Sequence, residues 1–218
     1  MPVPPLDDTA AVWSLPAERR EGRPLLVALH GYGGHEGDMV DLVPDLPAEY
    51  ATVALRAPIA RERGYTWFRV RGSSGDPSSA DVAPAADAVL DWIDAHRGSA
   101  PFVGLLGHSQ GGAVALQGLR RRPSGLAFVV TLAGFVATGR ESGDEELETL
   151  RPPVFWGRGA RDDVVFGADI DRMAAFLPAR STLTRREYPE LDHGISKEEL
   201  ADTAAFLRAQ LPPQPSGG

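Results

Sequence analysis

Three stretches of this 218-residue sequence contain residue types that could together form a nucleophilic active site. Ser109 lies in GHSQG, between an apolar run and an alanine-rich stretch. His193 lies in LDHGIS, and two adjacent aspartates, Asp162 and Asp163, lie in GRGARDDVV. A serine hydroxyl is a good nucleophile only when a base takes its proton, and the base needs an acid that fixes its tautomer. The three stretches supply one candidate for each role.

The pattern around Ser109 is G-x-S-x-G, which carries meaning only in the right structural context. That context is a buried strand before the serine and a helix after it, so that the hydroxyl stands clear of a sharp turn. FVGLLG (Phe102–Gly107) is typical of such a strand, and Gln110–Arg121 is typical of such a helix. The alternative is a serine in an ordinary tight glycine turn. The two flanks favour a nucleophile.

His193 is the best placed of five histidines to act as the base. It follows the last expected strand and precedes the last expected helix, on the side where Ser109 should emerge. His108 adjoins the serine and points elsewhere, His96 lies at an expected helix end, and His30 begins a glycine-rich loop. The alternative for His193 is a solvated loop residue.

Asp162 and Asp163 both follow an expected strand at Pro153–Gly157, so both are candidates for the acid. Adjacent aspartates could also cap the helix that follows. The chain order of serine, aspartate and histidine is the order of an α/β-hydrolase triad. Three loops that supply three roles in that order are less easily explained by chance than any one of them.

The oxyanion that develops during acyl transfer needs backbone N–H donors. The glycine-rich turn at His30–Gly34 follows a strand and can aim one N–H into the site, and Gln110 supplies another from the first turn of its helix. A phosphate-binding loop is the alternative for HGYGG, but neither phosphate-loop motif is present. No H-x-x-x-H or H-E-x-x-H motif supports a metal site, so we expect no metal and no cofactor.

Apolar runs of strand length alternate with amphipathic stretches along the chain, which predicts a mostly parallel sheet with helices on both faces. The expected strands are Leu25–Leu29, Ala51–Leu55, Phe102–Gly107, Leu126–Leu132, Pro153–Gly157 and, nearer the sheet edge, Ser181–Tyr188. The expected helices are Asp81–His96, Gln110–Arg121, Gly167–Leu177 and Lys197–Leu211.

Length and composition favour one soluble α/β domain over residues 1–211, followed by a disordered tail over 212–218. The loop at residues 71–79 is either a mobile segment near the site or a solvated connection. The chain has 22 basic and 30 acidic residues, a formal charge of −8, which argues against nucleic acid and anionic membrane as partners. It has no cysteine, which excludes disulfides and thiolate catalysis. Without a signal-like N-terminus or a membrane-spanning stretch, a cytoplasmic location is expected.

Over residues 25–211 the chain resembles the phospholipase/carboxylesterase family of α/β-hydrolases, which includes acyl-protein thioesterases and small bacterial carboxylesterases. The resemblance rests on six stretches in the family's order: LHGYGGHEGDM, LRAPIA, YTWFRV, GHSQGG, GRGARDDVV and LDHGIS. It implies an α/β-hydrolase fold with a sheet of the eight-stranded type, shortened here, without a metal or a large lid domain. Members of the family often form dimers, so a homodimer is an open expectation.

The family motif Gly-x-x-Asp-x-Val-Val falls on Gly159, Asp162, Val164 and Val165, so the resemblance favours Asp162 over Asp163. It also implies oxyanion donors at Tyr32 and Gln110. It places Trp67 and Phe68 in the substrate pocket, where His108 and Val164 are further candidates; the alternative for the Trp-Phe pair is ordinary core. The chain departs from the family at Arg69, where an acidic residue is usual, and at Asp192, where a glycine is usual.

These observations predict a serine carboxylesterase that hydrolyses short- to medium-chain esters of small molecules through an acyl-enzyme, with Ser109, Asp162 and His193 as the triad. An acyl thioesterase or lysophospholipase and a dienelactone-type hydrolase are alternatives. An acyltransferase, or a non-catalytic ligand-binding protein on a hydrolase scaffold, would also fit parts of the pattern.

Overall fold

The computed structural model describes residues 3–70 and 77–213. In these ranges a seven-stranded sheet has the order β1-β3-β2-β6-β7-β8-β9, with β1 antiparallel to β3 and the other pairs parallel. Its strands are β1 (Val12–Trp13), β2 (Leu25–Leu29), β3 (Ala51–Leu55), β6 (Val103–His108), β7 (Phe128–Leu132), β8 (Pro153–Gly159) and β9 (Thr182–Tyr188). A separate hairpin consists of β4 (Ile59–Ala60) and β5 (Tyr65–Thr66).

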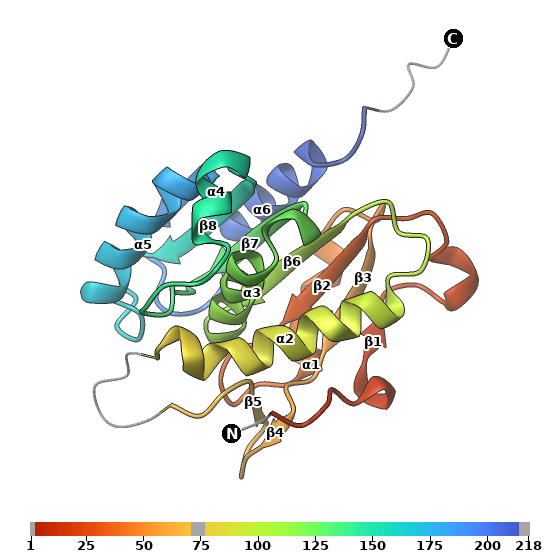
Figure 1. The fold of residues 1–218 in the computed structure, drawn as a ribbon. Helices are drawn as coiled ribbons and strands as arrows, with labels where there is room; N and C mark the ends of the chain where they lie inside the picture. The colour runs from red at the N-terminus through yellow and green to blue at the C-terminus, as the bar shows by residue number, and fades with distance from the viewer. Residues whose placement is uncertain (1–2, 71–76, 214–218) are drawn as a thin grey trace.

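Helices cover both faces of this sheet (Figure 1). They are α1 (Glu36–Val40), α2 (Ser79–His96), α3 (Gln110–Arg121), α4 (Asp144–Leu150), α5 (Ala168–Arg180) and α6 (Lys197–Ala209). One core cluster joins the sheet to α2, α3, α4 and α5, and a second joins it to α1 and α6. The predicted α/β-hydrolase architecture is therefore confirmed.

Burial on both faces explains why the central strands are continuous apolar runs. Every residue of β2, β3 and β7 is buried. The expected edge strand is β9, whose alternating polar residues are mostly exposed at the end of the sheet. Strand burial could thus be read from the sequence because an apolar run marks each of these strands. The run expected at 126–132 begins two residues before β7, and β8 extends two residues past its expected end at Gly157.

The strand order reverses between β2 and β6, since β3 lies on one side of β2 and all later strands of the sheet lie on the other. In open parallel sheets, ligands bind at such a switch point, outside the carboxyl ends of the strands. β2 leads into the glycine-rich turn and β6 leads into Ser109. The topology therefore brings the expected oxyanion loop beside the expected nucleophile.

Several element boundaries differ from those expected. Helix α2 begins at Ser79 rather than Asp81, because Ser78 and Asp81 form a reciprocal capping box. Helix α5 continues to Arg180, past the expected end at Leu177. The short elements α1, α4, β4 and β5 were not expected, since each offers too few residues for a periodic pattern.

Two predicted segments fall partly outside the described residues. Of the expected loop at 71–79, residues 71–76 lie outside them, and Ser79 belongs to α2. Of the expected tail at 212–218, residues 214–218 lie outside them. None of the helices found in residues 3–70 and 77–213 combines the length and the apolar character needed to cross a membrane.

Candidate active site

Ser109 occupies the turn between β6 and α3 in a conformation that side chains rarely adopt. Its φ is 52° and its ψ is −116°. The turn is held at both ends, because the Ser109 N–H donates to the carbonyl of Leu132 (2.8 Å) and the Ser109 carbonyl accepts from Ala113 N–H (3.1 Å). Strained backbone of this kind is typical of active sites, where surrounding contacts hold it in place. This is the geometry of a nucleophile elbow.

Two glycines allow this turn to form. A Cβ at Gly107 would overlap the backbone of Gly111, and a Cβ at Gly111 would overlap the carbonyl of Leu29. The first glycine lets α3 start directly against β6, and the second lets α3 pack against the end of β2. Both glycines of the G-x-S-x-G pattern therefore have a steric reason.

A continuous chain of hydrogen bonds joins the three predicted catalytic side chains. His193 Nε2 lies 2.8 Å from Ser109 Oγ, and His193 Nδ1 lies 2.9 Å from Asp162 Oδ2. The carboxylate can only accept, so Nδ1 carries the proton and Nε2 is left free to accept from the serine hydroxyl. This is the tautomer that a general base requires.

Asp162 rather than Asp163 meets the histidine. The Asp162 side chain is 1% exposed, and its Oδ1 accepts from the N–H groups of Val164 and Val165, both at 2.9 Å. These two donors fix the carboxylate, so Oδ2 points at His193. Asp163 is exposed. From residue types alone, either aspartate could be the partner of His193. The family resemblance favoured Asp162, which the structure places beside His193.

The histidine loop is held against the end of β8 and against His108. Arg161 N–H donates to the carbonyl of Leu191 (3.0 Å), and a Cβ at Gly159 would overlap that carbonyl. His108 Nε2 lies 2.9 Å from the carbonyl oxygen of His193, to which it must donate. Burial lowers the pKa of His108, which favours a neutral ring. His108 thus supports the base by a bond to its backbone, which the sequence reasoning missed.

The glycine-rich loop passes directly over the nucleophile. A Cβ at Gly31 would lie 3.5 Å from Ser109 Cβ. Gly33 N–H donates to the carbonyl of Tyr65, and Tyr65 N–H donates to the carbonyl of Gly34, both at 2.8 Å. The Tyr32 amide makes no hydrogen bond to any residue in the described ranges. It is therefore available to a substrate, as is the Gln110 amide at the first position of α3.

His30 holds the start of this loop from inside the core. It is 0% exposed, its Nδ1 lies 2.7 Å from the carbonyl of Gly31, and its Nε2 accepts from Ala57 N–H at 3.0 Å. Burial lowers its pKa, consistent with a neutral ring that donates through Nδ1. The sequence placed His30 at the start of the loop but gave it no role. Both of its hydrogen-bond partners are backbone groups, which a residue pattern does not reveal.

The expected pocket residues Trp67 and Phe68 belong to the core, at 0% and 2% exposed, and Phe68 also borders a cavity together with Arg69. The Trp67 indole donates to the carbonyl of His30 (2.8 Å). The Gln110 side chain accepts from Trp67 N–H (2.8 Å) and donates to the Phe68 carbonyl (3.0 Å). The pair thus anchors the elbow helix and the oxyanion loop to each other, and its part in a substrate pocket stays a prediction.

The other two expected pocket residues, His108 and Val164, have different surroundings. The His108 ring is engaged with the His193 backbone, as described above. Val164 is 59% exposed, and two residues further along Phe166 is equally exposed. Both follow the catalytic aspartate and present apolar surface to solvent at the same edge of the sheet. Phe166 was not singled out from the sequence, since the motif ends at Val165.

A family model described as "Alpha/beta hydrolase family" matches residues 25–217. The chain belongs to the alpha/beta hydrolase family. Its match starts at β2 and includes the whole triad, so membership covers the part of the chain that builds the site.

Named members of the hydrolase family resemble this one over much of its length. Acyl-protein thioesterase 1 of Mycosarcoma maydis is 25% identical, over 96% of this chain and 89% of the relative. A probable carboxylesterase of Oryza sativa subsp. japonica is 30% identical, over 67% of this chain and 58% of the relative. The predicted resemblance to thioesterases and carboxylesterases is confirmed.

A solved structure shows the same hydrolase fold. The carboxylesterase from Mesorhizobium loti aligns with a TM-score of 0.76 at 20% identity, and the match covers 95% of this chain and 99% of that one. At this level of identity the likeness concerns the fold. The elements that carry the elbow and its partners thus belong to a fold shared with a hydrolase of similar size.

Proposed function

We propose that this chain is a serine hydrolase of carboxylic ester bonds, with Ser109 as nucleophile, His193 as general base and Asp162 as the orienting acid. The observation that carries the proposal is the hydrogen-bonded chain from Ser109 Oγ to His193 and on to Asp162, at 2.8 and 2.9 Å. Relatives named as carboxylesterases and as an acyl-protein thioesterase support the same class of reaction.

The first half of the reaction forms an acyl-enzyme. Ser109 Oγ attacks the acyl carbonyl carbon while His193 Nε2 takes the hydroxyl proton. The carbonyl oxygen becomes an oxyanion, which accepts from the amides of Tyr32 and Gln110. Collapse of this intermediate breaks the bond to the alcohol, which leaves with the proton held by His193.

The second half returns the enzyme to its starting state. Water attacks the acyl carbonyl and gives a proton to His193 Nε2, and Ser109 Oγ then leaves and recovers that proton. The products are a carboxylic acid and the free hydroxyl. The two backbone donors at Val164 and Val165 hold the Asp162 side chain in place beside His193 throughout.

Short- to medium-chain acyl groups are the proposed substrates. In residues 3–70 and 77–213 no large extra domain accompanies the sheet and its covering helices. Val164 and Phe166 offer exposed apolar surface beside the catalytic aspartate, which suits a modest acyl group. A steep preference for long-chain lipids would contradict this assignment.

A thioesterase is the second candidate, favoured by the acyl-protein thioesterase that matches 96% of this chain. The same triad would serve, since a thiol replaces the alcohol as leaving group. A dienelactone-type hydrolase remains a weaker alternative, as does an acyltransferase in which an alcohol intercepts the acyl-enzyme. Product analysis with competing alcohols separates transfer from hydrolysis.

The decisive experiment is hydrolysis of p-nitrophenyl esters from C2 to C16 by wild type and Ser109→Ala. We expect the variant to lose about 10³-fold or more in kcat/KM. Ser99→Ala is the matched control, since Ser99 is an exposed serine before β6, and it should retain full activity. Equal turnover by wild type and Ser109→Ala would contradict the mechanism. If neither protein hydrolyses these esters, the chain acts on thioesters or is a binding protein. Labelling by a fluorophosphonate would separate these two interpretations.

A cytoplasmic location and a homodimer stay predictions. The acidic balance of 22 basic to 30 acidic residues fits a freely diffusing protein. Cell fractionation tests the first prediction, and light scattering of the purified chain tests the second.

A further inference from the structure

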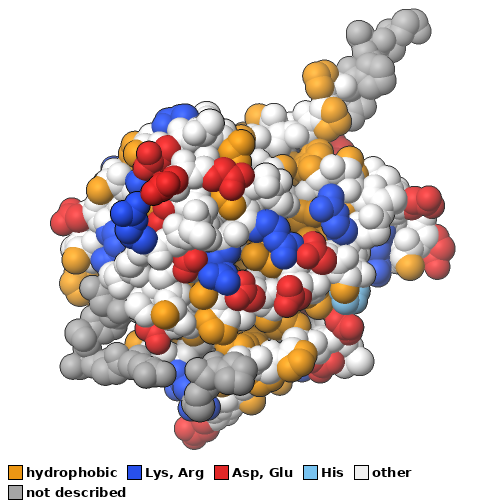
Figure 2. Space-filling model, viewed as in Figure 1, with side chains coloured by type: hydrophobic (Ala, Val, Ile, Leu, Met, Phe, Trp, Pro, Cys, Tyr) orange, Lys and Arg blue, Asp and Glu red, His pale blue; other side chains and the backbone are white. Residues whose placement is uncertain are grey.

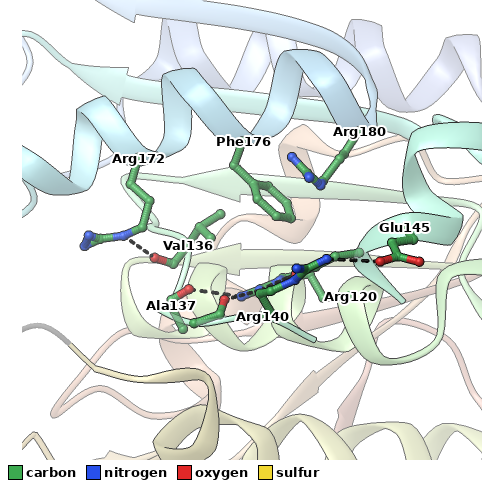
Figure 3. Close-up of a pocket in the computed structure, with 10 residues that line it drawn as sticks. Arg120, Val136, Ala137, Arg140, Glu145, Arg172, Phe176 and Arg180 are labelled. Atoms are coloured by element: carbon green, nitrogen blue, oxygen red, sulfur yellow. Dashed lines mark hydrogen bonds and ion pairs between the residues drawn. The ribbon is translucent and has the colours of Figure 1, made fainter. Parts of the chain in front are cut away.

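A second cavity lies away from the triad, between α5 and the segment 136–140 that follows β7 (Figure 3). Its volume is about 460 Å³, within the size range of small-molecule sites. Arg120 lines it near the end of α3, whereas Ser109 precedes the start of that helix. Eleven residues of helix separate them by roughly 16 Å at 1.5 Å per residue. Ser109, Asp162 and His193 are not among the residues that line the cavity, which is therefore separate from the triad.

One face of α5 forms a wall of this cavity. Arg172, Phe176 and Arg180 are four residues apart, so they project from the same side of the helix. Figure 3 shows Arg172 bonded to Val136, Phe176 directed toward the same segment, and the Arg180 guanidinium beside the Phe176 ring. The guanidinium carbon of Arg180 lies 4.7 Å from the centre of the Phe176 ring. The wall therefore combines an aromatic surface with a cation at each end.

More arginines than carboxylates line the cavity, because the partners of Arg172 and Arg180 (Asp169 and Glu148) lie outside the lining. Four arginines face the cavity, at positions 120, 140, 172 and 180, against the carboxylates of Asp144 and Glu145. The whole chain has a formal charge of −8. Over the face shown in Figure 2, basic and acidic side chains are interspersed. The larger number of arginines than carboxylates in the cavity lining is therefore a local feature.

Arg120 lies at the bottom of the cavity, and its guanidinium is already hydrogen-bonded to protein acceptors, so it cannot bind a ligand. It is 1% exposed and binds both carboxylate oxygens of Asp144 at 2.8 Å. It also donates to the carbonyls of Ala137 (3.0 Å) and Gly139 (2.7 Å). An incoming anion must therefore pair with the arginines at the rim.

Arg140 and Arg180 are the arginines whose present partners are easily exchanged. Arg140 pairs with Glu145 at 3.0 Å, but the two side chains are 84% and 82% exposed, and such pairs contribute little. Arg180 pairs through Nη2 with Glu148, which is half exposed. Its Nε is buried and has no acceptor within the described part of the chain. A buried donor without an acceptor is unfavourable, so a turn of the Arg180 side chain that brings Nε to a ligand oxygen would relieve it.

We propose that this cavity binds a small organic anion, with a carboxylate or phosphate head between Arg140 and Arg180 and an apolar body against the accessible part of Phe176. Guanidinium groups bind both oxygen heads through paired, charge-assisted hydrogen bonds. The apolar wall selects against a bare inorganic ion. The site does not include Ser109, so the proposal holds whether or not the chain is an esterase.

The test is isothermal titration of the whole chain with hexanoate, hexyl phosphate and hexanol at fixed ionic strength. We expect saturable binding of at least one of the two anions, with hexanol about tenfold or more weaker. The stronger of the two anions identifies the head group. Ser109→Ala should bind as wild type does, which separates this cavity from product binding at the triad.

The variant pair Arg140→Gln/Arg180→Gln should weaken the anion by about tenfold or more. The matched control is Arg19→Gln/Arg208→Gln, which removes the same two charges at exposed positions outside the cavity and should leave binding unchanged. If the first pair fails to fold, Arg140→Gln alone decides, since its side chain is almost fully exposed, and a loss of about threefold or more is expected. Absence of saturable binding, or equal binding by variants and controls, would overturn the proposal.

Discussion

At the residue scale, hydrogen-bond geometry distinguishes the candidates for each proposed catalytic role. Asp162 and Asp163 share one residue type and adjacent positions, yet only Asp162 has its carboxylate buried and bonded to two amides and an imidazole. His193 and His108 likewise have one residue type and two roles, since His193 meets the serine and His108 meets the His193 backbone. These side chains differ in where they point and in how deeply they are buried. Neither feature follows from the residue type.

Asp162→Asn should lower kcat/KM for a p-nitrophenyl ester by about 10³- to 10⁴-fold, because an amide in place of the carboxylate favours the wrong histidine tautomer. Asp163→Asn is the matched control and should change activity less than about threefold, since Asp163 is exposed. Comparable losses in the two variants would mean that the wrong aspartate has been assigned.

At the scale of elements, α3 is positioned by small residues at its start and is ordinary helix further along. A Cβ at Gly111 would overlap the carbonyl of Leu29 at the end of β2. A Cβ at Gly118 would meet Leu105 Cδ1 at 3.4 Å, an ordinary van der Waals contact. The same substitution at two points of one helix should therefore have opposite effects.

Gly118→Ala should raise the free energy of unfolding by about 0.5–1 kcal/mol, because alanine restricts the unfolded chain and favours helix. Gly111→Ala should lower it by about 2 kcal/mol or more and reduce esterase activity, since α3 must move away from β2 and carry Ser109 with it. Urea denaturation and ester hydrolysis measure the two effects. A Gly111→Ala variant with full stability and activity would refute the steric account of the elbow.

At the scale of the whole molecule, one buried acid makes stability depend on pH. Glu199 lies in the first turn of α6, is 0% exposed, and neither of its carboxylate oxygens has a hydrogen-bond partner in the described ranges. Burial raises its pKa from 4.5 to about 7. The folded state therefore holds this proton more tightly than the unfolded chain does.

The contribution of Glu199 to the free energy of unfolding is fully present below about pH 4.5 and is lost as the pH rises toward 7. We expect a decrease of about 2–3 kcal/mol across this window in the wild type. Glu199→Gln should remove most of this decrease, because an amide does not ionise. Glu198→Gln, at an exposed neighbour, should keep it. Denaturant titrations at several pH values measure the difference, and parallel curves for all three proteins would contradict the assignment.

The sequence by itself determined the order and type of the main elements and singled out the residues proposed as nucleophile and base. Each is a local property: apolar runs match strand length, and the pattern around Ser109 contains its own strand, glycines and helix. The resemblance to known hydrolases added the preference for Asp162. The extent of a single domain over 1–211 stays a prediction.

Only the tertiary structure decided which groups meet across the fold. Trp67 and Phe68 follow a short hairpin and could equally line a pocket or fill the core, and the choice depends on where the Gln110 side chain reaches. The roles of His30 and His108 depend on backbone partners, which no residue pattern specifies. The arginine-lined cavity joins positions from 120 to 180, which the sheet and α5 bring together. Contacts between distant segments arise from the packing of the whole chain. No local stretch of sequence therefore specifies which residues will meet.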